Sequence, residues 1–298
     1  MRTAFINQLI EEAHNDEKIF LIVGDLGFSV VEPFAKEFPK RFLNAGVSEQ
    51  NMTGIAAGLA MEGYTVFTYS IANFPTLRCM EQIRYDVCYH DLNVKIVAVG
   101  GGYAYASLGP SHHATEELGM LRTIPNLIVT APGDPLEAKA VTTILAKEKG
   151  PAYIRLGKAG EPVVHQSIGD LKTGEAICLI KGKSTVVLTT GAMLKYAYDF
   201  IRENNLNYGL YSFPFIKPID EKALKQISEV YKNVITLEEH QRSAGFGSAV
   251  LECLNDLTER NEISSIPRVR RIAIPDKFIH VAGSQDHLRK LSGLILNI

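Results

Sequence analysis

The stretch that decides the fold reads SEQNMTGIAAGLAM over residues 48–61, and YTVFTY follows it over residues 64–69. Small and apolar side chains lie almost all round the first part, which predicts a buried helix beginning near Glu49. The second part is a continuous β-branched and aromatic run, which is typical of a strand buried on both faces. A buried helix next to a buried strand indicates an α/β fold with a parallel sheet.

The same alternation extends in both directions along the chain. Further strands are predicted at residues 20–25, 94–99, 127–130, 152–156, 185–189, 208–211, 234–237 and 269–274, and helices at 75–89, 194–203 and from Asp134, Asp220 and Phe246. The polar, glycine- and proline-containing segment 157–175 separates two such series. The sequence therefore predicts two open, mostly parallel sheets, in domains that span residues 1–160 and 176–298.

Composition excludes several classes of protein. The 298 residues are 46% hydrophobic and 21% charged, which is ordinary for a globular chain. The net charge of −2 leaves no basic excess for nucleic acid. No signal-peptide core and no run of about 18 apolar residues is present, so no membrane association is expected. The four cysteines are scattered, which favours reduced thiols and a cytoplasmic location.

Loops that follow parallel strands are where ligands bind in open α/β sheets. In this chain those loops are residues 24–29, 69–74, 100–113 and 157–158. The sequence lacks the phosphate-binding loop of nucleotide hydrolases, the H-E-x-x-H zinc helix and the G-x-S-x-G nucleophile motif. No metal site is predicted in this chain, because the histidines at 112 and 113 have no convincing further ligands nearby.

Three groups of polar residues each allow two interpretations. Glu49 is either a helix-capping acid, which composition favours, or a placed functional acid, and Ser48 weakens the first interpretation because it offers a capping side chain. His112 is either an acid–base or substrate-binding residue, or a surface histidine. The run at residues 238–240 is interpreted as structural, with side chains that pack inside the fold or lie at an interface.

Longer motifs resemble one family. Residues 42–60, FLNAGVSEQNMTGIAAGLA, resemble the signature of transketolases and the related deoxyxylulose-phosphate synthases. The blocks GPSHH at 109–113, PGDPLE at 132–137, and LEEH at 237–240 with GFG at 245–247 resemble later parts of the same family. The resemblance covers nearly the whole chain, and it implies a pyrimidine-binding domain followed by a transketolase carboxyl-terminal domain.

One family motif is missing. Such enzymes hold Mg²⁺ and the diphosphate of thiamine diphosphate with a Gly-Asp-Gly stretch, which does not occur here. The resemblance therefore implies the C-terminal subunit of a split transketolase, which transfers a two-carbon ketol unit between sugars or sugar phosphates. A partner chain would carry the missing motif and hold Mg²⁺ (or Ca²⁺), in a heterotetramer with thiamine diphosphate shared between chains.

The resemblance also implies roles for residues in contact with the cofactor. Glu49 would hydrogen-bond the N1′ atom of the aminopyrimidine ring, a catalytic role that needs a carboxyl group able to carry a proton. Burial among apolar side chains shifts the pKa of a carboxyl group in that direction. Phe74 would stack on the ring, Ile71 replaces a second family aromatic, and Asp25 is a further cofactor position. His112 would be catalytic and contact a donor oxygen.

Substrate contacts follow from the same resemblance. The positions implied to bind substrate are Arg2, Ser29, Tyr103, His112, Arg155 and Lys158. Lys158 replaces an arginine and so offers a point charge instead of a bidentate fork. Leu108 and Gly100 replace polar family residues, and Tyr103 and Tyr105 add bulk nearby. These departures favour a modified sugar, deoxy or nucleotide-linked, and leave the donor and acceptor open.

Two other functions stay open at this stage. The first is the chemistry of deoxyxylulose-phosphate synthase, or another decarboxylation and condensation of a 2-oxo acid, which release of CO₂ from pyruvate would reveal. The second is a non-catalytic subunit, which failure to bind thiamine diphosphate in the presence of the partner would favour.

Overall fold

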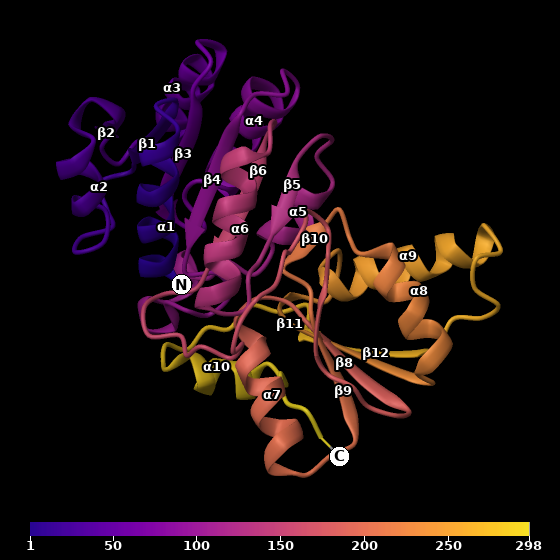
Figure 1. Ribbon diagram of the computed structural model, residues 1–298. Helices are drawn as coiled ribbons and strands as arrows, with labels where there is room; N and C mark the ends of the chain where they lie inside the picture. Colours follow the sequence, from indigo (N-terminus) through magenta and orange to yellow (C-terminus); the bar gives the residue numbers. More distant parts are fainter. Residues whose placement is uncertain (298) are drawn as a thin grey trace.

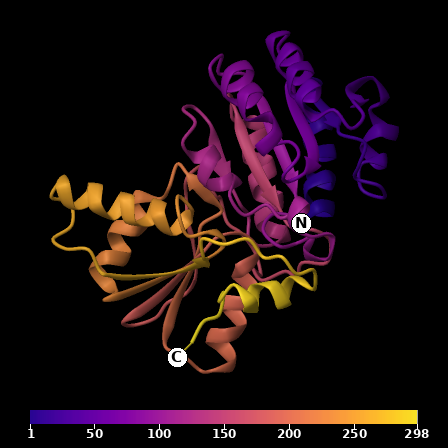
Figure 2. The ribbon, with the colours of Figure 1, turned by 180° about the vertical axis from the view of Figure 1, so that it is seen from behind.

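The computed structural model describes residues 1–297, which form two open sheets with helices on both faces (Figures 1 and 2). The first sheet contains, in spatial order, β10 (Phe215–Lys217), β5 (Ile128–Thr130), β6 (Ala152–Leu156), β4 (Val94–Val99), β3 (Thr65–Ile71), β1 (Ile19–Val23) and β2 (Phe42–Asn44). The second contains β12 (Arg268–Ile274), β11 (Asn233–Gln241), β8 (Thr185–Thr189), β9 (Tyr208–Ser212) and β7 (Ile177–Ile180). Only the edge strands β10 and β7 pair antiparallel within the described residues, so the predicted fold class is confirmed.

Helices cover both faces of each sheet. Around the first sheet lie α1 (Arg2–Asn15), α2 (Glu32–Glu37), α3 (Glu49–Met61), α4 (Met80–Gln82), α5 (Glu117–Arg122) and α6 (Pro135–Lys147). Around the second lie α7 (Leu194–Glu203), α8 (Glu221–Val230), α9 (Phe246–Glu259) and α10 (Gln285–Leu291). Figure 1 shows α7 and α10 on one side of the second sheet and α8 and α9 on the other. Across residues 1–297, no helix combines the length and apolar character that crossing a membrane requires.

The two sheets share one apolar core. Met52 and Leu118 beside the first sheet belong to the same buried cluster as Val186 and Phe246 of the second. In addition, β10 lies within the second series along the chain, between β9 and α8, but pairs with β5 of the first sheet. Burying side chains from both sheets in one cluster favours a fixed arrangement of the two sheets. The domain limits at 160 and 176 stay a prediction.

A buried polar cluster fastens the segment between the two series. Asp134 caps α6 by accepting the Glu137 N–H at 2.8 Å, and its other oxygen accepts the N–H groups of Val164 and His165 at 2.8 and 3.0 Å. His165 Nε2 lies 2.7 Å from Glu137 Oε1. Burial lowers the pKa of His165, but the hydrogen bond and charge of Glu137 outweigh it and raise that pKa overall. The three side chains are of metal-ligand type, yet the oxygens of Asp134 and Glu137 already hold the 157–175 segment in place.

The sequence did not predict every element. The expected helix at 75–89 is interrupted: Leu77–Cys79 forms a 3₁₀ turn, α4 covers one turn, and Ile83–Cys88 forms a π-helical turn. The elements that were not predicted are the strands β2, β7 and β10 and the helices α1, α2, α5 and α10. By contrast, α3, α6, α7, α8 and α9 begin within a residue of the expected positions.

Candidate functional site

Glu49 begins α3 and is buried, with 1% of its surface exposed. Its Oε1 accepts a hydrogen bond from Ser70 Oγ at 3.3 Å, and its Oε2 lies 3.0 Å from an Arg78 guanidinium nitrogen. The predicted burial is therefore confirmed, but the expected apolar surroundings are wrong. The Ser48 hydroxyl does not cap the helix, because it donates to the Ala45 carbonyl at 2.7 Å.

Arg78 connects this carboxylate to an aromatic ring, which in turn contacts a histidine. The half-buried Phe74 ring meets the His112 ring edge-on, with centroids 5.4 Å apart. The Arg78 guanidinium, which pairs with Glu49, lies 5.3 Å from the centre of the Phe74 ring. Asn73 Nδ2 donates to the Ser111 carbonyl at 3.1 Å and joins the two loops. The structure thus brings Glu49, Phe74 and His112 together.

The loop after β1 passes close to the same carboxylate. A Cβ atom added at Gly24 would lie 3.6 Å from Glu49 Oε1. The next residue, Asp25, has a left-handed backbone with φ 55°, and its carboxylate accepts from Asn44 Nδ2 at 2.9 Å. Ile71 ends β3, and its carbonyl accepts the Phe74 N–H at 2.8 Å. Asp25 on its loop and Ile71 at the end of β3 therefore lie at the same sheet edge as Glu49.

Arg2 lies in the first turn of α1. Its charge lowers the pKa of both Tyr69 and Tyr105, although burial raises both pKa values more strongly. Within residues 1–297 the buried Tyr69 hydroxyl has no hydrogen-bond partner of good geometry. The Tyr105 ring covers Gly100, where an added Cβ would lie only 2.1 Å from a ring carbon.

Two other substrate positions are exposed at this edge. Ser29 has a left-handed φ of 63°, and its N–H donates to Glu32 Oε1 at 2.8 Å. Lys158 follows β6 and is exposed. A Cβ at Gly157 would meet the Met1 side chain at 2.9 Å, so the end of β6 lies beside the start of α1.

Tyr103 and Arg155 are buried and make contacts within the chain, and their expected contact with substrate stays a prediction. Tyr103 is buried, its hydroxyl lies 2.9 Å from Ser292 Oγ, and its N–H donates to Glu239 Oε1 at 2.7 Å. Arg155 is buried too, with Nε 2.9 Å from Glu117 Oε1 and a further donor 3.0 Å from the Glu239 carbonyl. Both side chains are engaged in contacts with the second sheet and its helices.

The run at residues 238–240 lies at the interface between the sheets, as interpreted from the sequence. Glu238 accepts the N–H groups of Phe246 and Gly247 at 2.6 and 2.8 Å, and burial raises its pKa to about 7. His240 Nε2 accepts the Gly119 N–H at 3.1 Å, and burial, helped by the charge of Arg155, lowers its pKa to about 4. A neutral imidazole therefore joins β11 to α5.

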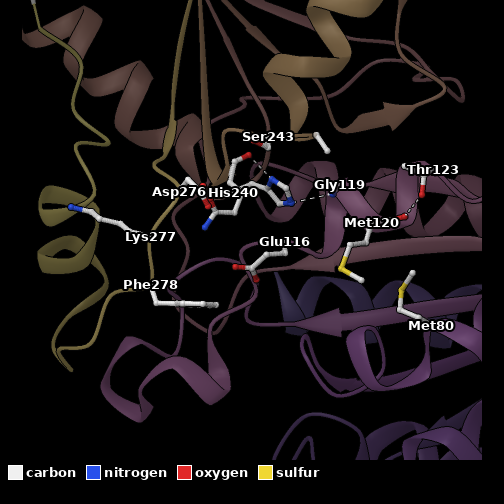
Figure 3. Close-up of a pocket in the computed structure, with 12 residues that line it drawn as sticks. Met80, Glu116, Gly119, Met120, Thr123, His240, Ser243, Asp276, Lys277 and Phe278 are labelled. Atoms are coloured by element: carbon white, nitrogen blue, oxygen red, sulfur yellow. Dashed lines mark hydrogen bonds between the residues drawn. The ribbon is translucent and has the colours of Figure 1, made fainter.

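A cavity of about 800 Å³ opens between the two sheets, away from Glu49. Figure 3 shows Met80 and Met120 on one side of it, Phe278 on the other, and His240 and Glu116 between them. Glu49, Phe74 and His112 do not line it. The volume of this cavity is therefore no indication of where Glu49, Phe74 and His112 lie.

Sequence reasoning missed Arg78 and Ser70, the two side chains that contact the Glu49 carboxylate. Ser70 lies within β3, and Arg78 lies four residues beyond Phe74 in the loop that follows β3. A sequence signal was available for Arg78, because a cation just after a candidate ring-binding aromatic lies on the ligand edge of the sheet.

Comparison with known proteins assigns the family. The transketolase pyrimidine-binding domain model matches residues 1–160, and the transketolase C-terminal domain model matches residues 174–296. An apulose-4-phosphate transketolase subunit of Phocaeicola vulgatus is 34% identical, over 93% of this chain and 88% of that protein. A 6-deoxy-6-sulfo-D-fructose transketolase subunit of Clostridium sp. (strain MSTE9) is 31% identical, over 99% and 90%.

A solved structure and a longer relative agree with these matches. A split gene transketolase, described as an inactive beta4 tetramer, superimposes with a TM-score of 0.85 at 34% identity, over 98% of this chain and 93% of that one. The 1-deoxy-D-xylulose-5-phosphate synthase of Listeria innocua is also related, at 34% identity, but this chain spans only 43% of its length. The chain belongs to the transketolase family and carries its pyrimidine-binding and C-terminal domains.

Proposed function

We propose that this chain is the C-terminal subunit of a split, thiamine-diphosphate-dependent transketolase. With a partner chain it transfers a two-carbon ketol unit between sugars or sugar phosphates. The single observation that carries the proposal is the buried Glu49 carboxylate at the ligand edge of the first sheet, grouped with Phe74 and His112. The family's enzymes use thiamine diphosphate, and two relatives that match this chain over nearly their full length are named as transketolase subunits.

The residues present fit the pyrimidine half of that cofactor. Glu49 offers a buried carboxylate oxygen, and the half-buried Phe74 offers an aromatic surface next to it. When bound, thiamine diphosphate supplies the nucleophilic carbon that the cleavage of a ketose needs. The chain's own part would be to orient the ring through Phe74, to exchange a proton through Glu49, and to bind a donor oxygen through His112.

The diphosphate half of the cofactor needs a second chain. No Gly-Asp-Gly stretch occurs in the sequence, so the Mg²⁺ or Ca²⁺ site would belong to the partner. Large apolar side chains stay exposed in the loops around Glu49, among them Phe28 at 75%, Val47 at 72% and Leu108 at 55%. An exposed apolar patch of this kind marks an interaction surface. We infer that a partner subunit covers it, in a heterotetramer with the cofactor at the subunit boundary.

Glu49→Gln tests the role of the carboxylate. In the complex with the partner chain, we expect kcat to fall by about 10²–10⁴-fold, because the amide cannot exchange the proton that a general acid–base residue moves. The control is Glu12→Gln, which changes another buried carboxylate outside the site. Ketol transfer from a ketose phosphate and the size of the complex are measured together. Full activity with assembly intact would refute the assigned role.

Substrate feeding separates the two remaining functions from this one. The complex receives either a ketose phosphate with an aldose acceptor, or pyruvate with the same acceptor. Ketol transfer without CO₂ release supports the proposal, whereas CO₂ release from pyruvate supports the chemistry of the synthase relatives. If calorimetry detects no thiamine diphosphate binding in the complex, the chain is a non-catalytic subunit. The cytoplasmic location stays a prediction.

A further inference from the structure

Arg78 makes two contacts that together describe a ring-like occupant of the site. One guanidinium nitrogen lies 3.0 Å from Glu49 Oε2. The planar guanidinium also lies over the Phe74 ring, 5.3 Å from its centre. Guanidinium groups stack on aromatic faces and donate hydrogen bonds in their own plane, so both contacts are of the expected kind.

These are the same two contacts that the proposed function gives to the aminopyrimidine ring of the cofactor. A flat, nitrogen-bearing ring would stack on Phe74 and hydrogen-bond to Glu49. The guanidinium and the aminopyrimidine therefore need the same carboxylate and the same aromatic face, and one group must leave before the other binds. This inference rests on the proposed function and concerns a residue to which neither the sequence nor the relatives assigned a role.

We propose that Arg78 is a positioning residue that holds Glu49 in the cofactor-free subunit and competes with the aminopyrimidine of thiamine diphosphate for Glu49 and Phe74. Cofactor binding then includes the displacement of the Arg78 side chain towards solvent. The apparent affinity for the cofactor is lowered by the fraction of molecules in which Arg78 occupies the site.

The surroundings allow this displacement. The Arg78 side chain is 51% exposed, whereas the Glu49 side chain is 1% exposed, so only the arginine has an open path. Arg78 lies on the short 3₁₀ turn Leu77–Cys79 and not inside a long helix. Ser70 donates to the other Glu49 oxygen, so the carboxylate keeps one hydrogen bond after Arg78 leaves. The ion pair is open to solvent only on the arginine side, so the departure of Arg78 leaves a buried carboxylate that needs a new partner, which the aminopyrimidine would supply.

The test measures cofactor affinity rather than turnover. Thiamine diphosphate with Mg²⁺ is titrated by calorimetry into the complex of this chain with its partner, for the wild type, Arg78→Ala and Arg78→Met. We expect both variants to bind with an about tenfold lower Kd, because the competing ion pair and stacking contact are gone. Arg78→Lys keeps the charge but lacks the planar group, and its Kd should lie between that of the wild type and that of Arg78→Ala. Arg84→Ala is the control, since Arg84 is an exposed cation in the same segment, and its Kd should be unchanged.

Each outcome decides between the alternatives. A lower Kd in both Arg78 variants with an unchanged Arg84→Ala supports competition. An unchanged or higher Kd in Arg78→Ala and Arg78→Met, in complexes that assemble normally, overturns it and leaves the proposed function standing. If the wild-type complex binds no thiamine diphosphate, the proposed function fails and the competition fails with it.

Discussion

At the scale of single residues, Gly100 and Tyr105 form an interlocked pair. The Tyr105 ring occupies the space that a side chain at position 100 would need, and Gly100 has a left-handed φ of 85°. The resemblance to transketolases places a polar residue at position 100, so here the tyrosine fills that volume instead. Arg2 lies close enough to Tyr105 to lower the pKa of its hydroxyl. Any change in substrate preference from this departure would act through Tyr105 rather than the buried Tyr103.

Gly100→Ala should therefore destabilise the protein for two reasons. The added Cβ meets the Tyr105 ring, and the left-handed backbone disfavours alanine, so we expect a loss of about 2–4 kcal/mol in the free energy of unfolding. Gly63→Ala is the matched control, because Gly63 has φ 87° but no atom within 4 Å of an added Cβ in the described chain. It should lose only about 1 kcal/mol. Urea unfolding measures both, and equal losses would contradict the interlock.

At the scale of elements, one residue connects a helix to the segment between the two series. Asp134 caps α6 with one oxygen and holds the N–H groups of Val164 and His165 with the other. The pattern of aspartate followed by proline predicts the helix start from sequence alone. The second oxygen acts across 30 residues, and no local pattern reveals that contact.

Asp134→Ala should cost more than an ordinary helix cap. We expect a loss of about 2–3 kcal/mol in unfolding free energy, because the cap disappears and two buried N–H groups lose their acceptor. Ser284→Ala removes only the cap of α10, where the hydroxyl accepts the His287 N–H at 3.2 Å, and should cost about 1 kcal/mol. Limited proteolysis should cut residues 157–175 faster in the first variant alone. Equal cleavage rates would show that Asp134 does not fasten the segment.

At the scale of the whole molecule, the contact between the two sheets combines an apolar core with buried polar groups. Arg155 pairs with Glu117 there, and burial raises the pKa of that carboxyl group. His240 stays neutral and accepts the Gly119 N–H. Buried charges and hydrogen bonds of this kind fix one arrangement, because shifting either sheet would leave a polar group without its partner.

His240 should make stability sensitive to acid. Its folded-state pKa of about 4 lies below the ordinary value of 6.5, so the unfolded chain takes up a proton that the folded chain refuses. The contribution of this residue to the free energy of unfolding is fully present above pH 6.5. It falls by roughly 3 kcal/mol as the pH drops towards 4. His240→Gln keeps an acceptor for Gly119 and cannot titrate. We expect the stability of the wild type relative to this variant to fall between pH 6.5 and 4, as followed by urea unfolding, and a constant difference would contradict the assignment.

Local patterns were enough to determine much of this protein. The alternation of buried strands and helices specified the α/β class, because burial on both faces of a parallel sheet requires continuous apolar runs. The motifs placed Phe74 and His112 on loops after parallel strands and Glu49 at the start of a helix, and such loops and helix starts converge at one sheet edge.

Only the tertiary structure decided the contacts between distant segments. The pairing of Arg78 with Glu49 spans 29 residues, and the burial of Arg155 depends on Glu117 and on β11. The strand β10 has three residues between Pro214 and Pro218, and it forms only because β5 offers an open edge. The physical reason is the same in each case. A side chain's partner, burial and charge environment depend on which surfaces meet after folding, and the residues on those surfaces are not neighbours in the sequence.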